Sequence, residues 1–320
     1  MVRYKVVIPI VLKDIGLIKN NIDRILVNLG AYGVVFIGRA DIKEYLADVD
    51  NIEFIDEAEL QPNLNIEVIK QILIDHSGSP KRAGWYFQQF LKMAYALICE
   101  DEYYLVWDSD TLPLKKINFF NERNQPIISY RSFEKFDTPY YETIKSLLGI
   151  EIKPNKTTKS YVAEHMLFNV SIMKDLIQNI SNNNTLSSKS FFEIIIDSIS
   201  KEQLSLSGYS EFETYIAFVQ KYYPDTYVYR QWNNLRSGKV FLGQLPDSAS
   251  LEWIGQKFDS VSIERYDMQF RIFSYKFIQS FKFGSVYSIV APVIKLIHSF
   301  RMIIRKYLKP LLLRLYDPRS

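Results

Sequence analysis

Two aspartates stand where a metal-dependent reaction could take place. Asp108 and Asp110, separated by Ser109, directly follow the apolar and aromatic run Tyr103–Trp107. Carboxylates one residue apart at the end of a buried strand can bind one hard divalent cation and leave coordination positions for water and phosphate oxygens. Such a cation stabilises the negative charge on a diphosphate as it departs. An isolated D-x-D is often only an acidic turn or helix cap, but its place at a strand end favours a metal site.

The residues before this pair predict the elements that position it. Short β-branched runs alternate with stretches of helical periodicity. The expected strands are Lys5–Leu12, Gly33–Gly38, Asn51–Ile55 and Tyr103–Trp107, and the expected helices are Ile15–Leu29 (closed by Gly30), Glu67–Asp75 and Arg82–Cys99. This alternation indicates an α/β fold, with a mostly parallel sheet covered by helices on both faces. Ligands of such sheets bind outside the carboxyl ends of the strands, which is where the aspartates lie.

Three segments together resemble a known family. V-V-I-P-I near the start, G-W-Y-F-Q-Q-F-L-K at Gly84–Lys92 and Y-L-V-W-D-S-D-T at Tyr104–Thr111 are similar to GT-A (Rossmann-like) glycosyltransferases. More narrowly, the chain resembles the bacterial DUF6492-type group of capsule and surface-polysaccharide clusters, over residues 1–240 or so. The resemblance implies transfer of a sugar from a nucleotide diphosphate donor, with Mn²⁺ or Mg²⁺ bound at Asp108 and Asp110.

Several residues are candidates for binding the donor, taken here to be a UDP-sugar. Ile10 and Asp14 follow the first strand, where GT-A enzymes hold the base, and Asp14 can accept from a uracil N–H or cap the next helix. Arg82, Lys92 and the more distant Arg236 can neutralise the diphosphate. Trp85 can stack on a base or sugar, and Gln89 offers an amide to hydroxyls. The alternative for the 82–92 segment is an ordinary amphipathic helix.

The acceptor side and the catalytic base are expected in the second half. Glu164 and His165 can complete a metal shell or bind the acceptor, although a lone histidine is more often structural. Trp232 is a further acceptor candidate. An inverting transferase needs a carboxylate that deprotonates the acceptor hydroxyl. Glu211 is the first candidate and Glu213 the second, in a helix over Glu211–Val219 with Ser210 as its N-cap. The alternative is an acidic first turn that suits the helix dipole.

The C-terminal residues differ from the rest in charge. Residues 271–320 contain ten Lys or Arg and one acid, a net charge of +9, whereas the whole chain carries +3. Basic and apolar positions alternate at helical spacing through Phe283–Tyr316, with Pro292 expected early or at a kink and Pro310 at the end. Residues 271–320 are therefore interpreted as an amphipathic tail on an anionic membrane surface. Packing on its own domain or in a homodimer is the alternative. The longest uncharged stretch near the C-terminus, 283–294, is too short to span a membrane.

These observations define the predicted protein. One cysteine, ample apolar content and an acidic body exclude a disulfide scaffold, a disordered chain and a nucleic-acid binder. We expect a catalytic domain at 1–270, with a nucleotide-sugar half to about residue 115 and an acceptor half after it. The expected reaction moves a galactose-type hexose, galactofuranose among the candidates, to a polyprenyl-diphosphate-linked glycan at the inner face of the cell membrane. The rivals are a haloacid-dehalogenase-like phosphatase, which would use Asp108 as nucleophile, and a non-catalytic glycan-binding assembly protein.

Overall fold

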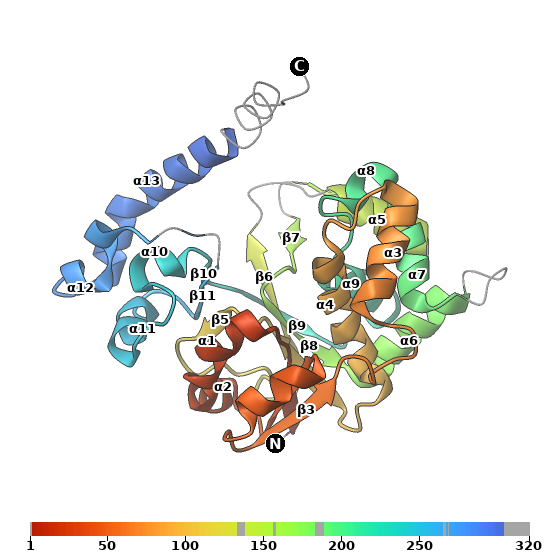
Figure 1. Cartoon of the computed structure of the whole chain (residues 1–320), viewed down its shortest axis with the longest axis horizontal. Coiled ribbons are helices and arrows are strands. Elements are labelled where there is room, and N and C mark those ends of the chain that lie inside the picture. The colour runs from red at the N-terminus through yellow and green to blue at the C-terminus, as the bar shows by residue number, and fades with distance from the viewer. Residues whose placement is uncertain are drawn as a thin grey trace. The chain divides into compact units, whose positions relative to one another are not determined.

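The chain is described from a computed structural model, which covers residues 2–132, 138–155, 158–182, 189–264, 267 and 269–303. It forms two compact units, Met1–Asn234 and Leu235–Ser320 (Figure 1). This division lies upstream of the expected boundary at residue 270. The reason is that residues 235–264 share a core with the start of the C-terminal helix, as described below.

A five-stranded sheet forms the centre of the first unit. Its strands are β1 (Tyr4–Pro9), β2 (Val34–Gly38), β3 (Ile52–Asp56), β4 (Tyr103–Trp107) and β8 (His165–Asn169), in the order β3-β2-β1-β4-β8. β1 pairs in parallel with β2 and β4, β2 pairs in parallel with β3, and only β8 is antiparallel. The predicted α/β class with a mostly parallel sheet is therefore confirmed. Because the order reverses between β1 and β4, the topology places a binding crevice outside their carboxyl ends.

Helices and short strands surround this sheet. The α-helices of the first unit are α1 (Ile15–Lys19), α2 (Ile22–Leu29), α3 (Ile66–Ser77), α4 (Ala83–Ala94), α5 (Thr138–Leu148), α6 (Val170–Asn182), α7 (Phe191–Asp197), α8 (Lys201–Leu204) and α9 (Glu211–Tyr222); η1 (Leu12–Asp14), η2 (Ala40–Leu46) and η3 (Tyr95–Leu97) are 3₁₀ turns. β6 (Ile127–Ser132) pairs with β7 (Lys159–Ser160) and β9 (Val228–Gln231), and β5 is Thr111–Pro113. The polar loop expected at 181–190 lies mostly outside the described residues.

Two predicted elements differ from those observed. The single helix expected over 15–29 is two helices, because the side-chain amide of buried Asn21 donates to the Leu17 carbonyl and interrupts the backbone ladder. The first strand ends at Pro9 rather than at Leu12. The chain then turns through η1, which leaves Val11 and Leu12 exposed. Gly30 does close α2 in the left-handed conformation, as expected.

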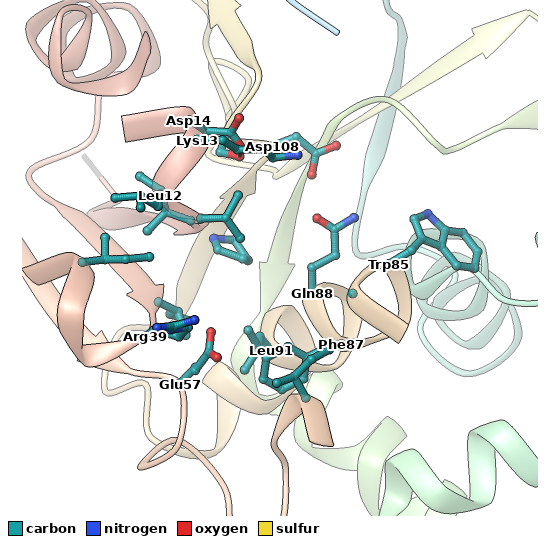
Figure 2. A pocket seen from close by; sticks show the side chains of 18 of the residues that line it. Leu12, Lys13, Asp14, Arg39, Glu57, Trp85, Phe87, Gln88, Leu91 and Asp108 are labelled. Atoms are coloured by element: carbon teal, nitrogen blue, oxygen red, sulfur yellow. Dashed lines mark hydrogen bonds between the residues drawn. The ribbon is translucent and has the colours of Figure 1, made fainter. Parts of the chain in front are cut away.

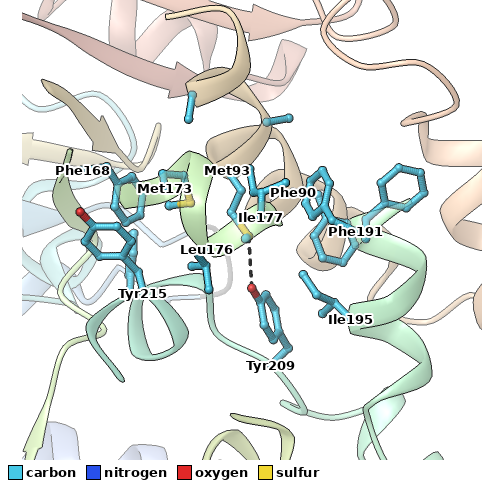
Figure 3. Close-up of a cluster of buried hydrophobic side chains, with 14 of the residues drawn as sticks. Phe90, Met93, Phe168, Met173, Leu176, Ile177, Phe191, Ile195, Tyr209 and Tyr215 are labelled. Carbon is cyan, nitrogen blue, oxygen red and sulfur yellow. Dashed lines mark hydrogen bonds between the residues drawn. The ribbon is translucent and has the colours of Figure 1, made fainter. Parts of the chain in front are cut away.

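Alternating side chains of the central strands bury both faces of the sheet. In β4, Tyr104 and Val106 belong to a large core that includes α4, α6, α7 and α9, whereas Tyr103, Leu105 and Trp107 belong to a second core with α1 and α2. This period of two is what a strand requires when helices cover both faces. Figure 3 shows the larger core, where the hydroxyl of buried Tyr209 donates to the Met93 sulfur between α4 and α9.

The second unit contains α10 (Gly238–Leu242), α11 (Ser248–Gly255), β11 (Ser260–Ser262), η4 (Arg271–Phe273), α12 (Tyr275–Ile278) and α13 (Phe283–Ile303); β10 (Asn234–Leu235) spans the division. Phe283 at the start of α13 is fully buried, with ring centroids 5.0 Å from Phe241 and 4.7 Å from Trp253. Pro292 lies inside α13, nine residues from its start. The end predicted at Pro310 lies outside the described residues.

Candidate functional site

A cleft opens where the parallel strands end. It has a volume of about 830 Å³ and is lined by residues that follow each of the four parallel strands. Ile10–Asp14 follow β1, Arg39 follows β2, Glu57 follows β3, and Asp108–Asp110 follow β4. The other wall is α4, with Gly84, Trp85, Phe87, Gln88 and Leu91. Pockets of this size, part apolar with a few convergent polar groups, are the usual form of small-ligand sites.

Asp108, Ser109 and Asp110 form a tight turn on the cleft wall. The Thr111 N–H donates to the Asp108 carbonyl (3.1 Å), and the Asp108 N–H donates to the Glu164 carbonyl (3.0 Å). The Ser109 hydroxyl donates to the Asp14 carboxylate at 2.9 Å, and the Thr111 hydroxyl donates to Asp110 at 3.3 Å. All three residues of the turn are half-buried. The expected aspartates are thus brought together with Asp14 on one stretch of the cleft (Figure 2).

Lys92 bridges two carboxylates inside the protein. Its ammonium lies 2.7 Å from Asp108 Oδ1 and 2.9 Å from Glu211 Oε1, and both Lys92 and Glu211 are buried. Burial alone would lower the pKa of Lys92, but the charges of Asp108 and Glu211 outweigh it and raise this pKa above its usual value. Burial raises the pKa of Glu211, and the Lys92 charge opposes this effect. Lys92 therefore neutralises protein carboxylates and does not line the cleft, where it was expected to meet a diphosphate.

Neither expected catalytic glutamate lines the cleft. Ser210 caps α9 as predicted, accepting from the Glu213 N–H. The buried Glu213 carboxylate accepts from the Ser160 hydroxyl (3.0 Å) and the Tyr161 N–H (2.8 Å), on a different side of the helix from Glu211. Each carboxylate already has the partners that a buried charge requires. This arrangement favours a structural part for both in tying α9 to its neighbours.

The residues of α4 divide between the interior and the cleft. Gln89 is buried; its carbonyl oxygen accepts from the Glu211 N–H at 3.0 Å, and its amide donates to the Trp85 carbonyl. Gln88, the next residue on the helix, lines the cleft together with half-buried Trp85. Arg82 is exposed just before α4 in the left-handed conformation, with its guanidinium 5.4 Å from the Trp85 ring.

The three acceptor candidates lie outside the cleft. His165 is buried, its ring stacked on Trp107 and in edge contact with Trp232 at 4.3 Å, and its Nε2 lies 3.0 Å from the Ser129 hydroxyl. Burial, with the nearby Arg230 charge, lowers the pKa of His165 to about 3. Glu164 is buried, adopts a positive φ of 62° and pairs with Arg131 at 3.2 Å. His165 is thus an enclosed, neutral ring that faces aromatic side chains.

Arg236, the remaining candidate, belongs to the second unit. Its guanidinium pairs with Glu264 of the same unit at 2.9 Å. The first unit ends at Asn234, so the described cleft is formed without Arg236.

Sequence reasoning missed two cleft residues of opposite charge. Arg39 forms a paired contact with Asp41 (3.1 and 2.8 Å), and Glu57 lies at the end of the neighbouring strand, its N–H bound to the Gly38 carbonyl. Burial in the cleft, with the nearby Asp56 charge, raises the pKa of Glu57, and Arg39 opposes the shift. No described side chain donates a hydrogen bond to the Glu57 carboxylate. The signal was available, since Arg39 directly follows the strand predicted at Gly33–Gly38 and Glu57 lies two residues beyond the strand predicted at Asn51–Ile55.

The aspartates fit a divalent cation that arrives with phosphates. No group of three or more His, Cys, Asp or Glu residues suited to a metal is found within the described parts of the chain. Mg²⁺ is commonly held by one or two carboxylates together with substrate phosphates, rather than by a cage of protein ligands. Half-buried Asp108 and Asp110 on the cleft wall match that donor set.

In a comparison with solved structures, 110 chains match, and the three described here are distant in sequence. The apo-form glycosyltransferase GlyE of Streptococcus pneumoniae TIGR4 is 9% identical with a TM-score of 0.38; the match covers 84% of this chain but spans only 57% of that protein. An active-site mutant of LgtC is 13% identical, with a TM-score of 0.36; the match covers 72% of this chain and 75% of that one. The 4-diphosphocytidyl-2C-methyl-D-erythritol synthase of Anaerococcus prevotii DSM 20548 is 9% identical (72% and 87%, TM-score 0.33).

No curated protein matches the chain. One family model does match, over residues 38–303, which is most of the sequence and includes the cleft residues from Arg39 to Asp110. The chain therefore belongs to DUF6492, a family of unknown function.

Proposed function

We propose that this chain is a GT-A-type glycosyltransferase that moves a hexose from a UDP-sugar to a glycan acceptor with the help of Mn²⁺ or Mg²⁺. One observation carries the proposal. The carboxyl ends of four parallel strands converge on a single cleft, and the Asp108–Asp110 turn lies on its wall. A long nucleotide diphosphate fits a cleft of about 830 Å³, and its phosphates supply the ligands that two carboxylates leave open.

The two ends of the cleft suggest how the donor lies. Figure 2 shows Asp14 and Asp108 at one end and Arg39 with Glu57 at the other, while Gln88 and Trp85 project from α4. The aspartates would hold the cation, which supplies positive charge to the departing diphosphate. Arg39 and Glu57 then face the base, where a guanidinium donates to a carbonyl and a carboxylate accepts from a ring N–H. Asp14, bound to Ser109, belongs to the metal end rather than to the base.

In the reaction, the acceptor hydroxyl oxygen bonds to the anomeric carbon as the bond to the diphosphate oxygen breaks. Its proton must pass to a base within hydrogen-bond reach, which can be a side chain or an oxygen of the departing diphosphate. Glu211 is held by Lys92, and Glu213 by Ser160 and Tyr161, so each would have to leave buried partners to act. We therefore propose a structural role for both and do not propose the inverting base of the sequence hypothesis.

The finer parts of the hypothesis rest on the sequence resemblance. We propose a galactose-type donor and a polyprenyl-diphosphate-linked acceptor in surface-polysaccharide synthesis at the inner face of the membrane. The resemblance in the segments Gly84–Lys92 and Tyr104–Thr111 supports this choice of pathway.

The first experiment is thermal unfolding of the purified chain with UDP, GDP, CMP or dTDP, each with and without Mn²⁺. A ligand that binds only the folded state stabilises it by about 2.7 kcal/mol at a hundredfold excess over Kd. We expect stabilisation by UDP that requires Mn²⁺ and is lost in Asp110→Asn. Glu67→Gln is the matched control, because Glu67 also lines the cleft but pairs with Lys70.

Two outcomes separate the glycosyltransferase proposal from the phosphatase alternative. If no nucleotide stabilises the wild-type chain and p-nitrophenyl phosphate is hydrolysed in an Asp108-dependent manner, the phosphatase alternative holds. If nucleotides bind, transfer or hydrolysis of UDP-galactose and UDP-glucose then identifies the donor.

A further inference from the structure

A segment of the second unit exposes both large apolar side chains and basic side chains. Residues 271–303 contain five Lys or Arg and no acid. Of the seventeen large apolar side chains that are exposed among the described residues, six lie within this segment: Ile272, Phe277, Phe281, Ile289, Val293 and Leu296. A concentration of this kind, unlike scattered apolar residues, marks an interaction surface.

Helix α13 has two distinct apolar faces. Phe283, Val290 and Ile294 are spaced by seven and four residues, and all three are buried in the unit. Ile289 and Leu296, also spaced by seven, are 75% and 65% exposed. Residues three, four or seven apart share a helix face. The core of the unit therefore accounts for one face of α13, whereas Ile289 and Leu296 lie on a face that is exposed among the described residues.

The turns before α13 also expose large apolar side chains. Ile272 in η4 and Phe277 in α12 are each 68% exposed, and Phe281 precedes α13 with 61% exposure. Lys276 and Lys282 lie between these apolar residues in the chain. We call the exposed apolar residues Ile272, Phe277, Phe281, Ile289, Val293 and Leu296, with the exposed basic residues Arg271, Lys276 and Lys282, the basic apolar face.

We propose that the basic apolar face docks on an anionic lipid bilayer. Large apolar groups beside lysines and arginines suit the boundary between acyl chains and negatively charged headgroups. A second copy of the chain fits less well, because two such faces would bring like charges together. No described helix is long and apolar enough to cross a membrane. Residues 304–320 continue the pattern in sequence, with five more Lys or Arg and a single acid, Asp317.

The sequence expectation placed the amphipathic stretch within Phe283–Tyr316. The structure assigns Val290 and Ile294 to the core of the unit and adds residues upstream of α13. The docking proposal does not depend on the glycosyltransferase proposal, because it uses only residues of the second unit.

The test is flotation of the full chain with vesicles of pure phosphatidylcholine, or of phosphatidylcholine and phosphatidylglycerol in equal parts. We expect flotation with the anionic vesicles only, and its loss in about 1 M salt, where the screening length is about 3 Å. Two double variants probe the face: Ile289→Ser with Leu296→Ser, and Lys276→Glu with Lys282→Glu. Each variant should weaken partition onto the anionic vesicles by roughly tenfold or more, because it removes apolar area or positive charge from the face.

Matched controls change exposed residues of the same types in the first unit. Val27→Ser with Leu206→Ser, and Lys43→Glu with Lys116→Glu, should float like the wild type. Equal flotation with both vesicle types, or flotation unchanged by both test variants, would overturn the proposal. A dimer in sedimentation analysis that Ile289→Ser with Leu296→Ser dissociates, without vesicle binding, would assign the face to a second copy. Circular dichroism checks that every variant is folded.

Discussion

Carboxylates in two regions of the first unit differ in what already binds them. At the start of α9, Glu211 and Glu213 are buried and hold a lysine, a hydroxyl and a backbone N–H. In the cleft, Glu57 is half-buried and accepts no hydrogen bond from a described side chain. The residue type is the same, but the two α9 glutamates are held by buried partners, whereas the Glu57 carboxylate lines the cleft.

This difference separates residues that build the fold from residues available to a substrate. Buried polar groups need partners, and those with a full set gain nothing from binding a ligand. Lys92, Gln89 and His165 follow the pattern of the interior, whereas Gln88 follows that of the cleft. Substitutions should therefore affect stability in one region and binding in the other.

The largest effect is expected for Lys92→Met. It leaves Glu211 buried without a counter-ion and removes the partner of Asp108, so unfolding in urea should show a loss of about 3–5 kcal/mol. Lys70→Met is the matched control; Lys70 pairs with Glu67 at the surface, where such pairs contribute about 0–1 kcal/mol. Adding Glu211→Leu to Lys92→Met should recover most of the loss. A Lys92→Met protein as stable as the Lys70→Met control would contradict a structural role for the bridge.

The second prediction concerns pH. The pKa of His165 is about 3 in the folded chain, below its ordinary 6.5, so the unfolded chain binds a proton that the folded chain does not. Neutral His165 therefore makes its full contribution to the free energy of unfolding above pH 6.5. This contribution is lost as the pH falls from 6.5 towards 3, by about 1.4 kcal/mol for each pH unit. His165→Gln should reduce the slope of unfolding free energy between pH 6.5 and 4.5. An unchanged slope would show that the ring is not enclosed.

The elements were largely predictable from sequence, and the partners of their side chains were not. Periodicity located β4 and α9, and the strand-end rule placed Asp108 and Asp110. Glu211 meets Lys92 across 119 residues of chain, and His165 meets Trp232 across 67, contacts that no local pattern encodes. Gln88 and Gln89 are indistinguishable by type, and only the packing of α4 decides which one is buried.

The third prediction compares the neighbouring residues Gln88 and Gln89. Gln89→Ala removes the acceptor of the buried Glu211 N–H, so it should destabilise the chain by about 1–3 kcal/mol. Gln88→Ala changes a cleft residue without a buried partner to lose, and its effect on stability should stay within about 0.5 kcal/mol. Urea unfolding measures both. Equal losses would mean that the helix face assigned to the cleft is itself part of the core.

The last prediction is for Glu57→Gln, whose effect should appear in binding alone. Its carboxylate has no hydrogen bond within the described chain to lose, and burial already raises its pKa, so a neutral amide should not destabilise the fold. If the carboxylate accepts a ring N–H of the base, its replacement should weaken nucleotide binding with Mn²⁺ about tenfold, or about 1.4 kcal/mol. Calorimetric titration of both proteins measures the change, with Glu67→Gln as the control on the same cleft. An unchanged nucleotide affinity in Glu57→Gln would show that the base is not recognised at the end of β3. The proposed metal site at the other end of the cleft would not be affected by that result.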